Sequence, residues 1–203
     1  MSIHSFKNNV SSISPHQEVL ALNCLTPIIN KILSVLEGIF HCFKQMIFPN
    51  KSFSKYYYFA YGSNLSIGRL EERVGKVIRC GLATLENYQF SFNKKGSDGT
   101  GKANIMPDDS SHVEGAVYQL TGEQLQQLDR HEGAPRHYKR INVSLNFSGR
   151  KIEAITYVAQ NRYISSRSLR PSDEYLSHIL NGAAQNCLSS TMIQKIQNAA
   201  SSR

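Results

Sequence analysis

Two short stretches of the sequence carry groups that could bind an anion or move a proton. Residues 58–65 read YFAYGSNL, so a short apolar run ends abruptly at Gly62, Ser63 and Asn64. The second stretch, LDRHEG, contains Glu132 directly before Gly133. Backbone N–H groups freed by a turn can bind an anion, and a carboxyl group can accept and return a proton. The elements around the two stretches decide whether they meet.

The YFAYGSNL segment predicts a strand end, a turn and the start of a helix. A helix is expected over Ile67 to Val74, with Asn64 or Ser66 as its cap. Such a junction leaves several backbone N–H groups unpaired and pointing the same way, which is an anion cradle. Gly62 would let a ligand approach the backbone closely. Taken alone, the segment is also consistent with an ordinary strand–turn–helix junction.

Glu132 is predicted to lie at the C-terminal end of a helix. Thr121 to Gln124 has the form of a capping box, and Gly133 can close the helix that follows. The negative end of the helix dipole disfavours an ionised carboxyl group and raises its pKa. A raised pKa suits a group that exchanges protons near neutral pH. The simpler alternative for Glu132 is a solvated surface glutamate.

Three other motifs do not favour a function. The segment GSDGTGK at 96–102 resembles a phosphate-binding loop, but Ala103 stands where Ser or Thr is required, so a hairpin loop is expected. His131 and His137 have the wrong spacing for a metalloprotease helix, so no metal site is predicted. Without a GxSxG motif, Ser63 is a weak candidate nucleophile.

The composition is that of an ordinary globular protein, with 203 residues, 40% apolar residues and a formal net charge of +8. The lysine and arginine residues are spread along the chain without a basic run, which disfavours nucleic-acid binding and favours a solvated basic surface. The four cysteines form no CxxC pair, and no signal peptide is evident. We therefore expect a reducing, cytoplasmic setting.

The first 55 residues are predicted to form an extension that precedes a catalytic domain at 56–203. Within it, apolar residues recur at helical spacing over about 27–48, which predicts an amphipathic helix. Lys31, Glu37 and Lys44 make this segment a poor transmembrane span. Packing on the domain, attachment at a membrane surface and contact with a partner through residues 19–49 all stay open.

Strands dominate the middle of the chain and helices flank them. Strands are expected at residues 57–60, 77–82, 88–93, 103–106 and 115–120, a hairpin at 138–158, and two helices after Pro171. This order predicts an α+β domain with a strongly bent, mixed or barrel-like sheet.

The combination of YFAYGSNL, GAVYQL, LDRHEG and the following Tyr138 resembles the γ-glutamylcyclotransferase family over about residues 56 to 200. The resemblance implies a γ-glutamylcyclotransferase-like mixed β-barrel with flanking helices. It also implies an enzyme of the lyase or acyltransferase type that forms 5-oxoproline from γ-glutamyl compounds, as in glutathione metabolism and the γ-glutamyl cycle. No metal or cofactor is implied.

The resemblance assigns roles to individual residues. Glu132 corresponds to the acidic catalyst. The glutamyl-binding loop corresponds to Tyr58, Phe59, Ala60, Tyr61, Gly62, Ser63 and Asn64, and the tyrosines of the pocket correspond to Tyr138, Tyr157 and Tyr175. The substrate class stays open among γ-glutamyl amino acids, amines and peptides. The alternative function is a catalytically silent binding protein of the same fold, directed to a membrane or a partner by its N-terminal helix.

Overall fold

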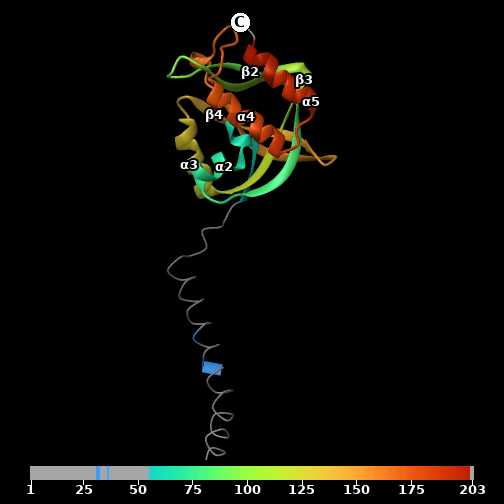
Figure 1. Cartoon of the computed structure of the whole chain (residues 1–203). Coiled ribbons are helices and arrows are strands. Elements are labelled where there is room, and N and C mark those ends of the chain that lie inside the picture. Colours follow the sequence, from blue (N-terminus) through green and yellow to red (C-terminus); the bar gives the residue numbers. More distant parts are fainter. Residues whose placement is uncertain (1–30, 33–35, 37–54, 202–203) are drawn as a thin grey trace, which may run out of the picture. The chain divides into compact units, whose positions relative to one another are not determined.

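The computed structural model describes residues 31, 32, 36 and 55–201 (Figure 1). The chain divides into two compact units, Met1–Ser52 and Phe53–Arg203. In the first unit, Lys31, Ile32 and Leu36 are helical. The rest of the helix predicted over about 27–48, and with it any contact through residues 19–49, lies outside the described residues.

The second unit contains five strands, four helices and two 3₁₀ turns among its described residues. In chain order they are β1 (Lys55–Ala60), η1 (Ser63–Leu65), α2 (Ile67–Val74), β2 (Ile78–Lys95), β3 (Gly101–Thr121), α3 (Gly122–Glu132), β4 (Tyr138–Phe147), β5 (Arg150–Ala159), η2 (Asn161–Tyr163), α4 (Asp173–Gln185) and α5 (Ser190–Ser201).

The strands form a closed barrel in the order β1-β3-β2-β4-β5. Neighbouring strands are antiparallel except for β1 and β5, which pair in parallel at Tyr58 and Ile155 and so close the barrel. The inward-facing side chains fill the core of the closed barrel. The predicted α+β fold, a mixed β-barrel with flanking helices, is confirmed.

Two long strands replace four of the predicted short ones. The segments 77–82 and 88–93 both belong to β2, and 103–106 and 115–120 both belong to β3. The β2–β3 pairing changes register three times, between Arg79 and Gly81, Glu86 and Tyr88, and Ser91 and Lys94. Irregularities of this kind bend and twist a strand without ending it. The polar residues at the bends look like loops in the sequence but stay within the strands.

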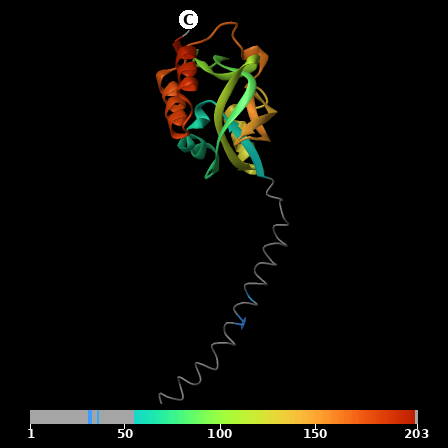
Figure 2. The same ribbon diagram turned by 90° about the vertical axis from the view of Figure 1, so that its right-hand side faces the viewer.

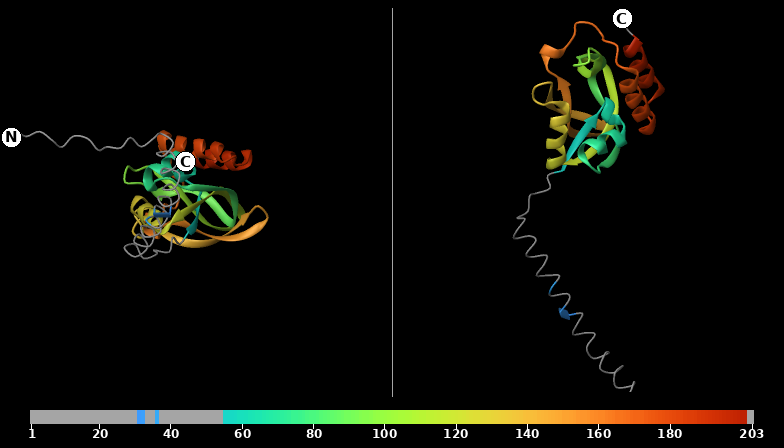
Figure 3. Two further views of the ribbon diagram at one scale, coloured as in Figure 1. Left: turned by 90° about the horizontal axis from the view of Figure 1, so that it is seen from below. Right: turned by 60° about the vertical axis from the view of Figure 1, so that its left-hand side comes forward.

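The helices lie around the barrel and begin and end as their sequences predict. Thr121 and Gln124 form the complete capping box of α3, and Gly133 ends it in the left-handed conformation. The helices α4 and α5 lie together on one side of the barrel (Figure 2), and α3 lies on another side (Figure 3, right). In the described part of the chain, no helix is both long and apolar enough to cross a membrane.

Helix α4 packs directly against the end of η1. A Cβ atom at Gly182 would collide with the backbone of Leu65 and Ser66, so the two elements touch at backbone distance. The side chain of Asn186 donates a hydrogen bond of 2.7 Å to the carbonyl of Leu65, and the hydroxyl of Tyr118 donates another of 2.9 Å. These contacts fix the end of the YGSN loop, by which we mean residues 61–64.

Candidate active site

A small pocket at the end of β1 brings together most of the residues singled out in the sequence. Its cavity volume is about 30 Å³, which is room for about two water molecules. Its lining consists of Tyr58, Tyr61, Gly62, Ser63, Asn64, Ala103, Glu132, Tyr138, Tyr157 and Tyr175. Of these ten residues, only Ala103 was not predicted.

Two residues assigned to the loop do not line the pocket. Phe59 and Ala60 are 0% and 1% exposed and belong to the hydrophobic core. Side chains alternate along a strand, so Phe59 points away from the face that carries Tyr58. Phe59 contributes its carbonyl, which accepts a hydrogen bond of 2.9 Å from Thr156 on β5. Phe59 and Ala60 therefore hold β1 in the core and do not line the pocket.

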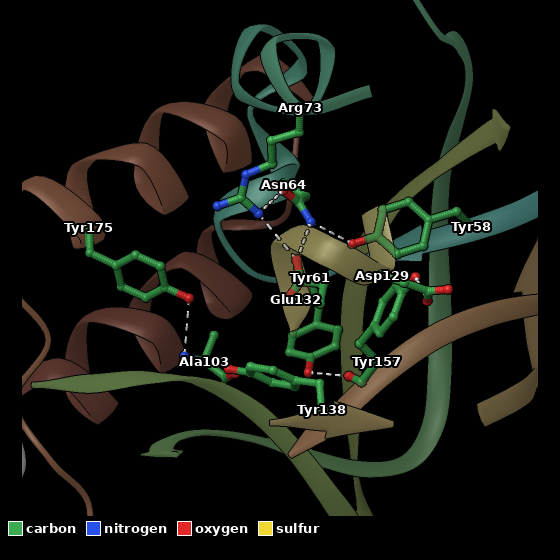
Figure 4. A network of polar contacts seen from close by, with 10 residues as sticks. All are labelled: Tyr58, Tyr61, Asn64, Arg73, Ala103, Asp129, Glu132, Tyr138, Tyr157 and Tyr175. Carbon is green, nitrogen blue, oxygen red and sulfur yellow. Dashed lines mark hydrogen bonds and ion pairs between the residues drawn. The ribbon is translucent and has the colours of Figure 1, made fainter. Parts of the chain in front are cut away.

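Glu132 is held through one of its two carboxyl oxygens (Figure 4). Oε1 accepts a hydrogen bond of 2.9 Å from Nδ2 of Asn64 and lies 3.2 Å from Nη1 of Arg73. Within the described residues, Oε2 accepts no hydrogen bond. One oxygen thus orients the carboxyl group while the other stays free for a proton.

The pKa of Glu132 is raised, as the sequence predicted, but mainly for another reason. Its side chain is only 16% exposed, and burial is the largest cause of the shift because it penalises the charged form. Arg73 and the hydrogen bond from Asn64 oppose the shift, since both favour the carboxylate. The solvated surface glutamate considered above is therefore excluded.

Asn64 connects three parts of the site. Its amide nitrogen donates to the hydroxyl of Tyr58 at 2.8 Å as well as to Glu132, and its Oδ1 accepts from Arg73 at 2.9 Å. Asn64 is therefore not the helix cap that was one of two possibilities. Ser66 caps α2, accepting from the backbone N–H of Arg69.

Arg73 is a site residue that the sequence prediction missed. It lies in the last turn of α2, where its guanidinium group reaches both Asn64 and Glu132 (Figure 4). A possible signal was its position on the helix that follows the YGSN loop, two turns beyond Ser66. Nothing in the sequence alone indicated that this face of α2 contacts Glu132.

The YGSN loop has the free backbone donors that its sequence suggested. Within the described residues, the N–H groups of Gly62, Ser63 and Asn64 donate to no protein acceptor. The carbonyls of Gly62 and Ser63 accept the hydrogen bonds that form the turn of η1. A Cβ atom at Gly62 would lie 3.1 Å from Cβ of Ala103 and 3.7 Å from the hydroxyl of Tyr175. Only glycine therefore leaves this part of the pocket open.

Five tyrosines make up the rest of the wall, and each hydroxyl has a defined partner. Tyr61 donates to the carbonyl of Tyr157 at 2.6 Å, and Tyr138 donates to the carbonyl of Ala103 at 2.9 Å. The hydroxyl of Tyr175 accepts from the N–H of Ala103 at 3.2 Å. Burial raises the pKa of all five, so they remain neutral hydrogen-bonding groups.

An ion pair beneath the pocket positions Tyr157. Its hydroxyl donates to Asp129 at 2.8 Å, and Asp129 in turn pairs with Arg140. The ring of Tyr157 packs edge-on against Tyr58, with 5.9 Å between the centroids. Helix α3 thus supplies both Glu132 and, one turn earlier, the carboxylate that fixes a wall residue.

His131 directly precedes Glu132 on α3. His131 is exposed at the surface beside Glu132, and its charge lowers the pKa of that carboxyl group slightly. Over the part of the chain that the structure describes, no group of three or more His, Cys, Asp or Glu side chains has a metal-binding arrangement.

The chain is similar in sequence to known proteins. The AIG2-like family matches residues 112–196. The γ-glutamylcyclotransferase of Bos taurus is 30% identical over 138 residues, covering 64% of this chain and 71% of that protein, and that of Mus musculus is 29% identical over 147 residues, covering 69% and 76%.

Solved structures show the same fold. A structure named γ-glutamyl cyclotransferase superposes with a TM-score of 0.65 at 28% identity and covers 71% of this chain and 87% of that one. YkqA from Bacillus subtilis gives a TM-score of 0.64 at 25% identity, with 77% of this chain and 57% of that one covered. From the sequence relationship and the shared barrel together, we conclude that the chain belongs to the γ-glutamylcyclotransferase family.

Proposed function

We propose that the protein converts γ-glutamyl amino acids, or γ-glutamyl amines and peptides, into 5-oxoproline and the free amine. Family membership supports a cyclotransferase activity in general. The observation that carries the specific proposal is the half-held carboxyl group of Glu132 in a pocket lined by the YGSN loop. Glu132 would be the general acid and base, and the loop would bind the glutamyl group.

The reaction needs one group that moves protons in both directions. The α-amine nitrogen of the glutamyl group attacks its own γ-carbonyl carbon, which closes a five-membered ring. The bond from that carbon to the leaving nitrogen then breaks. Glu132 takes a proton from the substrate's ammonium group, so that the neutral amine can attack, and returns it to the leaving nitrogen. The ring nitrogen then loses a second proton and the released amine gains one, so no proton is gained or lost overall. The raised pKa of Glu132 suits both transfers.

The YGSN loop supports the proposal through its unpaired N–H groups. The three donors of Gly62, Ser63 and Asn64 can bind the α-carboxylate or the carbonyl oxygen on which negative charge develops. Holding one end of the glutamyl chain favours the folded conformer in which the amine lies near the carbonyl. Ser63 would act here through hydrogen bonding and not as a nucleophile.

The tyrosine wall would shape and dry the pocket. Because the pocket is narrow in this structure, a glutamyl group fits only if the rings around it move apart. The hydroxyls of Tyr58 and Tyr175 stay protonated and act as acceptors in the hydrogen bonds described above, so their O–H groups can donate to substrate oxygens without adding charge. Because the rings exclude water, the hydrogen bonds that remain in the pocket become stronger.

The test is a direct assay on the full chain. γ-Glutamyl-alanine, glutathione and ε-(γ-glutamyl)-lysine are incubated with the protein, and 5-oxoproline and the released amine are measured together. We expect equal amounts of both products from at least one substrate. α-Glutamyl-alanine is the matched control, because its amide is not at the γ position and no alanine should be released. Absence of 5-oxoproline from every γ-glutamyl substrate would refute the proposal.

A further inference from the structure

A second, larger cavity adjoins the tyrosine pocket and contains most of the positive charge near Glu132. Its volume is about 540 Å³, and it shares Ser63, Glu132, Tyr138 and Tyr175 with the pocket. We call it the basic groove, because five lysine and arginine residues line it beside a single carboxylate. The five are Arg69, Arg73, Lys94, Lys102 and Arg130.

The basic groove gathers residues that are far apart in the sequence. Arg69 and Arg73 come from α2, Lys94 from β2, Lys102 from β3, and Arg130 from α3. The absence of a basic run in the sequence therefore did not mean that the charges stay dispersed. The pocket lining, by contrast, contains no lysine or arginine.

Lys94 is a buried cation with no carboxylate within ion-pair distance in the described part of the chain, although Glu132 and Asp98 are near enough to favour its charged form. It is 8% exposed, and within the described residues its ammonium group forms no ion pair and no hydrogen bond with a side chain. The group lies 5.5 Å from the ring centroid of Tyr138 and 5.6 Å from that of Tyr163. Burial lowers the pKa of Lys94, because an unpaired charge is costly to remove from water. Two aromatic faces compensate only part of that cost.

Arg69 is the second unpaired cation. Its Nε is buried and has no hydrogen-bond partner, and the guanidinium group forms no ion pair among the described residues. Two neighbours differ in this respect, since Arg73 pairs with Glu132 at 3.2 Å and Lys102 pairs with Asp98 at 2.8 Å. Arg130 also forms no ion pair among the described residues, but it is exposed to water. Lys94 and Arg69 are therefore the cations of the groove that lack both a carboxylate partner and full exposure to water, so their charge is left for a ligand.

We propose that the basic groove binds the carboxylates of the leaving amine, with Lys94 and Arg69 as the residues that determine specificity. The inference rests on the function proposed above, since it places the glutamyl group in the tyrosine pocket and the amine part in the groove, with the scissile amide at Glu132. The preferred substrates are γ-glutamyl compounds whose amine part is anionic. Two carboxylates on that part are favoured over one, and one over none.

The test compares three substrates whose leaving amines carry two carboxylates, one carboxylate and none. They are γ-glutamyl-glutamate, γ-glutamyl-alanine and γ-glutamyl-alaninamide, and kcat/KM is measured for each with the full chain. We expect kcat/KM to fall in that order, by roughly tenfold or more between the first and the last, because hydrogen bonds between charged groups are strong. The difference should lie mainly in KM.

Variants assign the preference to the groove. We expect Lys94→Met and Arg69→Met each to reduce the ratio of kcat/KM for γ-glutamyl-glutamate to that for γ-glutamyl-alaninamide by roughly tenfold. Lys151→Met is the matched control, because Lys151 is exposed on β5 and outside the groove lining, so the ratio should not change. Lys94→Met keeps the side-chain stem, and its melting temperature should not fall, since the lost charge was unpaired.

Failure of this inference can be told apart from failure of the proposed function. If all three substrates give 5-oxoproline with equal kcat/KM, or the variants lower stability and leave the preference intact, the groove assignment is wrong while the reaction stands. If no substrate is turned over, the reaction is wrong. Calorimetric titration with γ-glutamyl-glutamate and γ-glutamyl-alaninamide then still decides the groove, and equal affinities or no binding would overturn it.

Discussion

The tyrosine pocket and the basic groove both include Glu132, but their walls have opposite chemistry. The pocket is small and its wall is uncharged apart from Glu132, with neutral hydroxyls and backbone N–H groups as its donors. The groove is larger and carries five formal positive charges, three of which form no ion pair within the described residues. Hydrogen bonds in a narrow cavity select shape, whereas charges in a wide one select charge with little demand on shape.

The difference fits a reaction in which one half of the substrate is constant and the other varies. A glutamyl group always has the same size and the same polar atoms, so a close-fitting pocket can recognise it. Amine parts differ in size, and a carboxylate is the group that most of them share when they are amino acids or peptides. Four predictions test this division of roles, in order of expected effect.

The first prediction concerns the residue that the two cavities share. We expect Glu132→Gln to lower the rate of 5-oxoproline formation by roughly 10²–10⁴-fold for every substrate, because the amide cannot accept the proton. The substitution keeps the shape of the side chain, so circular dichroism and the melting temperature should show a folded protein. A variant with the parent rate would remove Glu132 from the mechanism.

The second prediction concerns the cation that holds Glu132. Arg73 lowers the pKa of Glu132, so Arg73→Met should raise that pKa further and move the acid limb of the kcat–pH profile to higher pH. At a pH below that limb, kcat should fall by roughly tenfold, because less of Glu132 is ionised. Arg73→Lys should recover part of the loss. An acid limb that stays in place in Arg73→Met would show that this ion pair does not set the proton affinity.

The third prediction changes the pocket without touching the groove. Gly62→Ala places a methyl group 3.1 Å from Ala103 and 3.7 Å from the hydroxyl of Tyr175, and we expect KM to rise roughly three- to tenfold for all substrates alike, because overfilling a closely packed site is unfavourable. The preference between charged and neutral leaving amines should not change. Gly68→Ala on α2 is the control, since its methyl group would meet no atom within 4 Å. An altered charge preference in Gly62→Ala would mean that the two cavities do not act separately.

The fourth prediction changes the groove without a mutation. Raising the ionic strength from about 0.01 M to about 1 M shortens the range of electrostatic attraction, and we expect kcat/KM for γ-glutamyl-glutamate to fall by roughly two- to fivefold. The value for γ-glutamyl-alaninamide should change little, because its leaving amine carries no charge. Equal salt dependence of the two substrates would contradict a charge-selective groove.

Local sequence signals predicted the parts of the fold that local chemistry determines. The capping box at Thr121 and Gln124 and the predicted cap of α2 at Ser66 are confirmed, because each needs residues only a few positions apart. The long strands β2 and β3 were not predicted as single strands. Their continuity depends on pairing with each other through three register shifts, which no local pattern reveals.

The sequence predicted only part of the site, because some of its residues have a local sequence signal and others depend on tertiary packing. The YGSN loop and Glu132 each have a recognisable local sequence, and the structure brings them to one pocket. Arg73 and Lys94 have no such signal, because their place depends on how α2 packs against α3 and on the tertiary contacts at the end of β2. The raised pKa of Glu132 was predicted from the helix dipole, while burial, a tertiary property, is its main cause.

The tyrosine wall also makes the protein a convenient optical probe of its own site. The sequence contains ten tyrosines and no tryptophan, so tyrosine is its principal intrinsic fluorophore. Five of the ten line the pocket. A ligand that separates these rings or changes the partners of their hydroxyls should alter the emission of half the fluorophores, and stopped-flow mixing could then follow occupancy without a label.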